Sequence, residues 1–274
     1  MKTARLVLLY VICIFFVLLC LFPFWMLFVN ATRSTVQIQQ GVAFFPSVHF
    51  LDNYNGLMKN GFMLYRAFFN SLFVSLSSTV IAIYFSALTA FGFFAYNFKF
   101  KKALFNIILL IIMLPGQLGM IGFYQFMLQI GLTDSYIPLI VPAVASAGTV
   151  FFLTQYLRSS FPLELVEATR IDGAHEFMIF NRIVLPIMSP ALATMAIFGV
   201  VGSWNSYVMP LILISSKDKY TMPMLIQLLK TNIYATDYGA MFLGLFFTML
   251  PLIIIYLLLS KYIIRGVAMG GIKE

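Results

Sequence analysis

Charge is scarce in this 274-residue sequence. Only 9% of the residues are Asp, Glu, Lys or Arg, whereas roughly 25% is usual for a soluble domain. Hydrophobic residues make up 62% of the chain and aromatic residues 17%. This composition excludes an ordinary soluble protein, and we predict an integral membrane protein.

Cysteine and histidine are almost absent, with two residues of each type. Cys13 and Cys20 lie in the same apolar run, where no disulfide framework is implied, so we interpret both as small apolar side chains. His49 and His175 are far apart in the sequence. No acid, base, nucleophile or metal ligands cluster, which argues against a membrane enzyme. We therefore expect no catalytic residue, cofactor or metal in this chain.

Six long runs are free of charged residues. They cover residues 6–29, 67–98, 103–130, 135–157, 187–214 and 239–260. At about 1.5 Å per residue the first run is roughly 36 Å long, enough to cross a hydrocarbon core of about 30 Å. The runs are continuous rather than alternating in polarity, so helices rather than a closed barrel must satisfy the backbone hydrogen bonds. We predict an all-α fold with six transmembrane helices in a single domain, residues 1–274.

The first run has a second interpretation, as the hydrophobic part of a cleaved signal peptide. Lys2 and Arg5 precede it, as basic residues do in such peptides. Their hydrophobic part is typically about 7 to 15 residues long, however, so the length of this run favours a retained membrane helix.

The distribution of Lys and Arg indicates the orientation, because cytoplasmic loops carry the excess. With the N-terminus inside, eleven of the 17 Lys and Arg residues fall on the inner side. Both termini and the loop at residues 158–190 are therefore predicted to be cytoplasmic. This asymmetry largely explains the net charge of +8. Since no basic face with readout residues is visible, we expect no nucleic-acid partner.

Charge concentrates in the loop at residues 158–190, between the fourth and fifth runs. Pro162 is placed to open a helix, where its missing N–H costs nothing, and we expect this helix to reach about Ile171. Asp172 and Gly173 then break it, because glycine tolerates backbone angles that other residues avoid. We expect Asp172 to cap a second helix over residues 174–183, so that the loop forms a bent helical hairpin.

This hairpin is expected to face another protein. Leu185, Pro186 and Pro190 mark its end, and proline is acceptable in the first turn of the fifth span. Small residues at positions 168, 173 and 174 leave a surface into which the side chains of a partner can press. Because the loop is polar and pinned between two membrane spans, a soluble partner is expected to occupy this surface.

The loop resembles the signature loop of the membrane-spanning permeases of ATP-binding-cassette importers. That pattern reads Glu-Ala-Ala, then Asp-Gly-Ala, then Ile-x-Leu-Pro. The positions that agree with it are Glu167, Ala168, Asp172, Gly173, Ala174, Ile183, Leu185, Pro186 and Pro190. Thr169 replaces the second Ala and adds one hydroxyl on a helical face. An amphipathic loop that lies on the bilayer is the less favoured alternative.

Four other segments resemble the carbohydrate-uptake branch of these importers, the maltose and glycerol-phosphate permease type. They are Phe69-Asn70-Ser71, Leu114-Pro115-Gly116-Gln117, Trp204-Asn205 with Pro210-Leu211, and the tail from Arg265-Gly266 to Lys273. Together they favour a sugar importer over an importer of amino acids, peptides or metals.

The resemblance implies a transport system with several subunits. A binding protein outside the membrane delivers the substrate, two permeases form the path as a heterodimer, and two ATPase subunits inside bind ATP and Mg. This chain would be one permease, surrounded by lipid in the plasma (inner) membrane of a bacterium. No G-x-x-x-x-G-K-[ST] phosphate loop occurs in the sequence, which fits an ATPase on a separate chain.

The resemblance also assigns residues to the ATPase contact. In the family the first helix of the loop sits in a cleft of the ATPase subunit, so Glu167 and Ala168 would lie at the contact, with Asp172 and Gly173 at the bend. Closure of the ATPase pair would then rock the spans between inward-open and outward-open states. The whole expected set of coupling residues is Glu167, Ala168, Asp172, Gly173, Ala174, His175, Leu185 and Pro186.

Candidates for the substrate path are polar and aromatic residues of the expected spans. A sugar hydroxyl without a hydrogen-bond partner in an apolar path costs about 1–3 kcal/mol. The candidates are Gln117, Tyr124, Gln125 and Gln129 in the third run and Trp204, Asn205, Ser206 and Tyr207 in the fifth. Hydrogen bonding between helices is the alternative role for the polar members of this set.

The function expected from the sequence is import of a di- or oligosaccharide. None of the six expected spans holds an ionisable residue, which would cost about 2.5–3.5 kcal/mol at a helix centre. This makes an ion-coupled carrier less favoured and suits a neutral substrate. Two alternatives stay open, a permease for a polyol or glycerol phosphate and a self-sufficient secondary carrier. Prolines at positions 115, 138, 142, 210 and 251 are expected either to kink spans at a gate or to be ordinary kinks.

Overall fold

Most of the part of the chain that the structure describes is helical. The structure is a computed structural model that describes residues 2–58, 61–230 and 237–270, and no strand occurs among them. The expected all-α class is thus confirmed. The chain divides into two compact units, the first made of Met1–Phe68 with Met224–Pro251 and the second of Phe69–Pro223 with Leu252–Glu274.

The first unit contains the N-terminal helices. Its elements are α1 (Lys2–Ala31), α2 (Thr35–Gln39), α3 (Phe50–Met58), most of α14 (Met222–Lys230) and the first parts of α4 (Gly61–Ala95) and α15 (Tyr238–Gly270). Ser34 starts α2 with a capping box, in which its hydroxyl accepts from the Gln37 N–H and the Gln37 side chain accepts from the Ser34 N–H. The side-chain amide of Asn53 donates to the carbonyls of Ala31 and Arg33 at 2.8 and 2.9 Å. These bonds tie α3 to the segment that follows α1.

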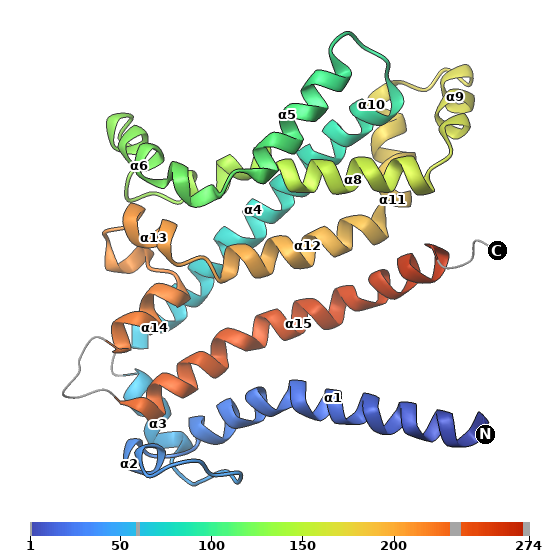
Figure 1. Cartoon of the computed structure of the whole chain (residues 1–274). Coiled ribbons are helices and arrows are strands. Elements are labelled where there is room, and N and C mark those ends of the chain that lie inside the picture. The colour runs from blue at the N-terminus through green and yellow to red at the C-terminus, as the bar shows by residue number, and fades with distance from the viewer. Residues whose placement is uncertain (1, 59–60, 231–236, 271–274) are drawn as a thin grey trace. The chain divides into compact units, whose positions relative to one another are not determined.

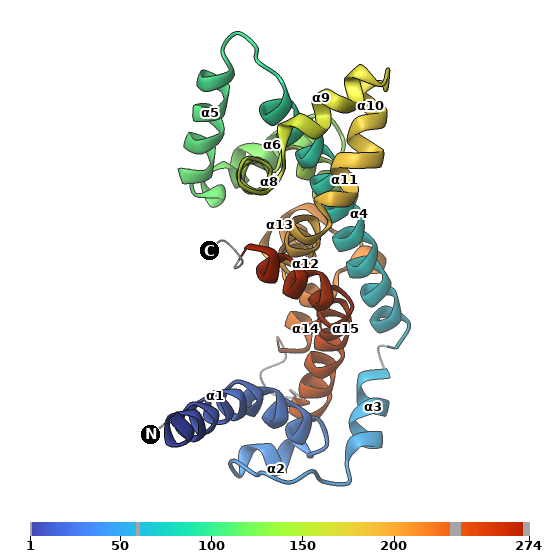
Figure 2. The ribbon, with the colours of Figure 1, turned by 90° about the vertical axis from the view of Figure 1, so that its right-hand side faces the viewer.

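The second unit carries the loop at residues 158–190 that the sequence predicts to contact an ATPase, and we call it the coupling loop. Its elements begin with the rest of α4, α5 (Lys101–Met113), η1 (Gly116–Gly119), α6 (Met120–Gln129), α7 (Ile137–Ile140), η2 (Val141–Ala145) and α8 (Ala147–Ser160). They continue with α9 (Leu163–Ile171), α10 (Glu176–Ile179), the π turn η3 (Phe180–Val184), α11 (Leu185–Ile187), α12 (Ser189–Trp204), α13 (Val208–Leu213), η4 (Lys217–Lys219) and the end of α15. Within this unit α8 packs against α5 and α12, and Figure 2 views α8 nearly end-on.

Several helices match the thickness of a membrane. Among the described residues, four stretches are long and apolar enough to cross one, Arg5–Ala31, Met63–Ala95, Ile137–Ser160 and Tyr238–Ser260. Two more are bent pairs, Lys101–Met113 with Gly116–Gln129 at 89° and Glu176–Ile187 with Ser189–Trp204 at 78°. Counting each bent pair as one span gives six. The most apolar part of the first stretch has no buried residue, as suits a helix that faces lipid.

The stretch at residues 103–130 bends sharply at Leu114–Pro115. Leu114 has an extended backbone with ψ of 126°, because proline disfavours the helical region for the residue before it. The short 3-10 turn η1 follows and leads into α6. The lack of charge in this run correctly predicts apolar helices, but the bend at Pro115 divides the run into two of them.

The core of the second unit joins the coupling loop to the helices on either side of it. Its buried members come from α4, α8, α9, α10, the π turn and α12, and include Ala87, Ala90, Phe91, Leu153, Leu157, Val166, Ile179, Phe180, Val184 and Ala191. The fully buried ring of Phe180 lies 5.8 Å from the rings of Tyr84 and Phe91 on α4. Burial of each side chain of this size contributes about 1.5–3 kcal/mol. The loop is thus held by the same packing that holds the spans.

Candidate coupling site

The first helix of the coupling loop, α9, follows the expected boundaries. Pro162 has an extended backbone and stands directly before the helix, which runs from Leu163 to Ile171. Glu164 lies in the first turn and Arg170 in the last turn, where each charge interacts favourably with the helix dipole. The helix thus begins and ends close to where the sequence predicts.

The bend after α9 depends on Gly173. Its φ is +82°, in the left-handed region that L-residues with a β-carbon avoid at a cost of about 1–2 kcal/mol. Its N–H donates to the Arg170 carbonyl at 3.0 Å, and the N–H of Asp172 donates to the Ala168 carbonyl at 3.1 Å. These bonds close the end of α9 in the manner common to helices that stop at glycine. The expected role of Gly173 in breaking the helix is confirmed.

The second helix of the loop differs from the expected one. It begins at Glu176, after His175, whose side chain makes no capping hydrogen bond. The prediction that Asp172 caps this helix is wrong, because the left-handed turn at Gly173 makes Asp172 the final cap of α9 instead. Only residues 176–179 are α-helical before the chain enters the π turn. Such turns are rare in α-helices and frequent at functional sites.

One side of α9 is buried while the other is open. Val166 is fully buried in the core, whereas Glu167, Ala168, Asp172, Gly173 and His175 are exposed. Two large apolar side chains near these residues in the sequence are also exposed to solvent. Ile171 is 86% exposed and Phe177 is 66% exposed. Ala174 and Leu185 are half-buried against the core, and Pro186 is exposed in the first turn of α11. Exposed apolar side chains beside carboxylates are typical of a protein–protein contact.

An ion pair spans the bend between the two helices. Arg170 donates from Nε to Oε1 of Glu176 at 2.6 Å and from Nη2 to Oε2 at 3.2 Å. The hydroxyl of Tyr96, just beyond α4, donates to the same carboxylate, and the guanidinium lies 5.1 Å from the centre of the Tyr96 ring. The hydrogen bond with Glu176 raises the pKa of Arg170, so this cation stays charged.

Sequence reasoning missed Glu176 and Tyr96. The signal for Glu176 was present, because opposite charges stand six residues apart on either side of a glycine. No signal pointed to Tyr96, which approaches only through the tertiary fold. The two side chains fix how the bend sits against the end of α4.

The candidates for the substrate path lie on two segments of the second unit. Among the glutamines, Gln117 in η1 and both Gln125 and Gln129 on α6 are exposed, whereas Tyr124 on α6 is half-buried. In the second segment, Trp204 is buried at the end of α12 and Asn205 after it is exposed. Ser206 and Tyr207, which precede α13, are half-buried. α6 packs against α13. The fold therefore brings the segments that carry the two groups to the same end of the unit, and their role in the path stays a prediction.

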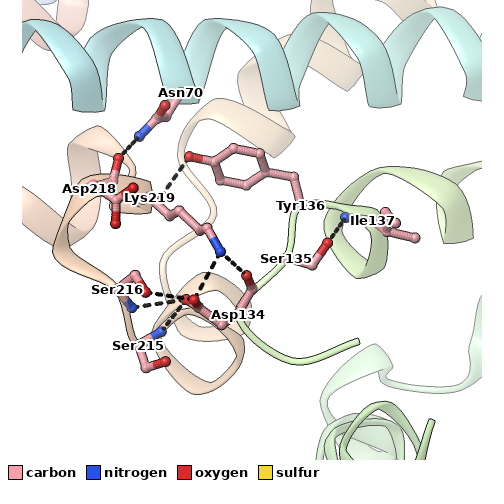
Figure 3. A network of polar contacts seen from close by, with 9 residues as sticks. All are labelled: Asn70, Asp134, Ser135, Tyr136, Ile137, Ser215, Ser216, Asp218 and Lys219. Atoms are coloured by element: carbon pink, nitrogen blue, oxygen red, sulfur yellow. Dashed lines mark hydrogen bonds and ion pairs between the residues drawn. The ribbon is translucent and has the colours of Figure 1, made fainter. Parts of the chain in front are cut away.

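A second polar cluster lies at this end of the unit (Figure 3). We call it the 134–219 cluster, and it consists of Asp134, Ser215, Ser216 and Lys219. One carboxylate oxygen of Asp134 accepts from the N–H groups of Ser215 and Ser216 at 3.0 and 2.9 Å. The other oxygen accepts from the Ser216 hydroxyl at 2.6 Å and from Nζ of Lys219 at 2.9 Å. These bonds, led by the one from the Ser216 hydroxyl, hold the pKa of Asp134 well below its usual range.

Neighbouring residues extend the 134–219 cluster. Tyr136 donates its hydroxyl to the Lys219 carbonyl at 3.2 Å. The amide of Asn70, on α4, donates to the carbonyls of Asp218 and Tyr220 at 2.9 and 3.0 Å. Nothing in the sequence pattern pairs these three segments, and the cluster was not foreseen.

Comparison with known proteins identifies the family. Residues 80–269 match the family described as "Binding-protein-dependent transport system inner membrane component". The chain belongs to this family. It is a permease subunit of an ATP-driven importer and a multi-pass protein of the bacterial inner membrane, as the pattern of the coupling loop predicted.

Relatives of the permease share nearly its whole length. It is 35% identical to the arabinooligosaccharides transport system permease protein AraQ of Bacillus subtilis (strain 168), over 93% of this chain and 92% of that protein. It is 29% identical to the lactose transport system permease protein LacG of Rhizobium radiobacter, over 93% and 92%. It is also 29% identical to the sn-glycerol-3-phosphate transport system permease protein UgpE of Escherichia coli (strain K12), over 90% of each. These matches confirm the carbohydrate-uptake branch.

A solved structure has the same fold as the permease. It is a bacterial ABC transporter involved in the import of the acidic polysaccharide alginate, one chain of which matches with a TM-score of 0.81 at 20% identity. The match covers 96% of this chain and 98% of that chain. It supports the helical architecture described above.

Proposed function

We propose that this permease moves a di- or oligosaccharide into the cell and that an ATPase subunit grips α9 to drive the movement. The observation that carries the proposal is the two-sided build of α9. Glu167 and Ala168 face outward while Val166, next to them in the chain, is fully buried in the core of the second unit. A partner that holds the outer side therefore also displaces the packed inner side.

The path of the force runs through the π turn. Phe180 and Val184 are buried in the same core as Phe91 of α4 and Leu157 of α8. Protein interiors are close-packed and shift as units rather than deform smoothly. A displacement of α9 by the ATPase would therefore rotate the ends of α4, α8 and α12 together, which is the rocking that alternates access across the membrane.

The partners in this proposal complete the importer. The exposed acid and apolar side chains of the coupling loop suit a cytoplasmic ATPase with a basic, apolar-lined cleft. A second, different permease would form the other half of the path, and a binding protein outside the membrane would deliver the saccharide. ATP and Mg would be bound by the two ATPase subunits.

The relatives support a saccharide as the substrate. AraQ and LacG are named for arabinooligosaccharides and lactose, which are neutral sugars of two or more units. Glycerol phosphate is the second candidate, because UgpE is named for sn-glycerol 3-phosphate and is as similar as LacG.

The decisive experiment measures transport by the complete importer, purified through a tag on this permease and reconstituted into vesicles with its binding protein. We expect Glu167→Lys to lower ATP-dependent uptake of lactose or arabinotriose by at least about tenfold, because it reverses a charge at the proposed ATPase contact. Asp52→Lys, which reverses an exposed charge on α3 in the first unit, is the control and should leave uptake unchanged.

Three results would count against the proposed function. Normal uptake by Glu167→Lys would remove α9 from the coupling. Uptake of glycerol 3-phosphate without either sugar would replace the substrate class. Uptake by this chain alone, without ATPase or binding protein, would show a self-sufficient carrier.

A further inference from the structure

An uncharged segment with exposed apolar side chains follows α2 in the first unit. No Asp, Glu, Lys or Arg occurs at residues 34–51. Within this stretch, residues 42–48 form neither helix nor strand, and we call them the apolar loop. Four of its side chains are between 57% and 89% exposed, those of Val42, Phe44, Phe45 and Val48. Exposed apolar groups gathered in this way mark a contact with a protein or with a membrane.

The apolar loop lies beside α1. Gly41, between α2 and the loop, has a φ of +126°, which glycine adopts at no steric cost. The centre of the Phe44 ring is then 6.3 Å from that of Phe22 on α1. The Phe44 carbonyl accepts from Nε1 of Trp25, also on α1, at 2.9 Å.

These contacts place the loop well back from the end of α1. The helix ends at Ala31, and Trp25 and Phe22 precede that residue by six and nine positions. At about 1.5 Å per residue, Phe44 therefore meets α1 roughly 9–14 Å before the helix ends. The chain leaves α1, forms α2 and then returns along the helix.

The far side of the loop is also tied to the end of α1. The N–H of Ser47 donates to the hydroxyl of Thr32 at 2.8 Å, and the N–H of His49 donates to the Thr32 carbonyl at 3.0 Å. Thr32 is buried, directly after α1. Bonds on both sides of Phe45 thus hold the loop against the helix, while the Phe45 side chain stays exposed.

The length of α1 relates this position to the membrane. The last charged residue before its apolar run is Arg5, and the run begins at Leu6. A hydrocarbon core of about 30 Å takes up about 20 helical residues, which brings the far boundary of the core to Trp25. Tryptophan is enriched at such boundaries between hydrocarbon and headgroups. The apolar loop therefore meets α1 at the surface of the bilayer.

Lipid is the partner that fits this position. The most apolar part of α1 has no buried residue, so the helix beside the loop is open to lipid. A soluble protein works on the water side, where a charged rim is usual, and the loop carries no charge. The backbone of the loop is irregular, which is not tolerated in contact with lipid inside the hydrocarbon core. The loop is thus suited to the boundary and to no greater depth.

We propose that the apolar loop inserts into the bilayer surface at the end of α1 that the Lys and Arg distribution predicts to be outside. Phe45 and Val48 lie there among the headgroups and the first carbons of the acyl chains. The loop is a lipid anchor that fixes α2 and the start of α3 at the membrane surface. This anchor depends neither on the transported substrate nor on the ATPase contact.

The test places a fluorescent NBD label on the loop in the complete importer, reconstituted into vesicles of phosphatidylethanolamine and phosphatidylglycerol. Cys13→Ala with Cys20→Ala removes both cysteines of this chain, and Phe45→Cys supplies one for the label. Because Phe45 is 82% exposed, this substitution should leave the fold intact. Asp52→Cys, at an exposed charged position on α3, is the matched control. The chain without an added cysteine gives the background from the other subunits.

Two quenchers report where the label lies. Lipids that carry a spin label near the headgroup should quench the label at position 45 several-fold more strongly than the label at position 52. Lipids that carry the spin label near the end of the acyl chain should quench position 45 less, because the loop stays at the boundary. Iodide in the water should quench position 52 several-fold more strongly than position 45.

Two results would overturn the anchor. Equal quenching of both positions by iodide would place the loop in water. Shielding of position 45 from iodide and from both lipids would show that protein covers the loop. Shielding that appears only when the binding protein is added would identify that protein as the cover, and shielding without it would point to another subunit of the importer.

A second variant tests how the loop is held. Trp25→Phe keeps an aromatic ring on α1 but removes the N–H that donates to the Phe44 carbonyl. In this background we expect iodide to quench the label at position 45 more strongly and headgroup-labelled lipids to quench it less, with position 52 unchanged. Quenching identical to that with Trp25 would overturn the role of this bond in holding the loop.

Discussion

Two carboxylates, Glu176 and Asp134, mark opposite ends of the second unit, and each is held by a cation. Glu176 pairs with Arg170, six residues earlier, whereas Asp134 pairs with Lys219, 85 residues later. α8 and α12 each run from one end to the other, with α9 and α10 at one end and α13 at the other (Figure 1). The first pair closes a single bend, and the second joins two loops from distant parts of the chain.

The difference shows how each end of the unit is built. The bond between Arg170 and Glu176 closes the bend after α9, and the Tyr96 hydroxyl ties the same carboxylate to the end of α4. The 134–219 cluster holds the α6–α7 connection to the segment after α13, because Asp134 bonds the backbone of Ser215 and Ser216 as well as Lys219. We infer that the end with α9 moves as a preformed piece, whereas the other end is fastened.

The largest effect is expected from a substitution of Phe180, which anchors the coupling loop in the core. Phe180→Ala should lower the free energy of unfolding by about 3–5 kcal/mol, because it leaves a cavity beneath the π turn. Phe177→Ala, three residues earlier and 66% exposed, should change stability by about 0.5 kcal/mol or less. Thermal unfolding of the purified permease followed by size-exclusion chromatography measures both.

The same two variants separate anchoring from contact with the partner. Phe177→Ala should weaken co-purification of the ATPase despite its normal stability, since Phe177 belongs to the exposed apolar part of the loop. Equal stability of the two variants would mean that the π turn is not packed as described.

A pair of glycines provides a finer test. Gly173 near α9 and Gly131 near the 134–219 cluster both have positive φ, +82° and +69°, with open space where a β-carbon would be. Valine at either position should cost about 1–2 kcal/mol or more from backbone strain. Only Gly173→Val should also lower sugar uptake per ATP hydrolysed, by about tenfold, because it reshapes the coupling loop.

The measurement is uptake and ATP hydrolysis by the reconstituted importer, with thermal unfolding as the reference. If Gly131→Val uncouples transport as strongly as Gly173→Val, the difference between the two ends disappears. If neither variant affects coupling, the bend is a structural turn without a role in transmitting force.

The coupling loop was predictable where local physics decides its shape. Pro162 restricts the backbone and Gly173 permits a left-handed turn, so the bounds of α9 and the bend after it could be predicted from the sequence. The cap at Asp172 was predicted for the wrong helix, because two local solutions compete there and the left-handed turn at Gly173 ends α9 before a new helix can start. The π turn at 180–184 has no local signal and arises where Phe180 and Val184 pack into the core.

The other end of the unit was not predictable from the sequence. Asp134 and Lys219 are 85 residues apart and meet only through the tertiary fold, and neither residue stands in a pattern that names its partner. Composition and spacing revealed the class and the coupling loop, whereas the 134–219 cluster depends on contacts between distant segments.

The smallest expected effect concerns pH at the fastened end. The pKa of Asp134 is lowered in the folded protein, so its carboxylate stabilises the fold at every pH above its ordinary pKa of about 3.9 and loses that contribution as the pH falls toward the folded value. Asp134→Asn should therefore lower the unfolding temperature by a few degrees at pH 7 and by the same amount at pH 5. Below about pH 4 the difference between variant and parent should shrink, whereas a gap that closes already between pH 7 and 5 would show that the bonds to Ser216 and Lys219 do not hold the charge.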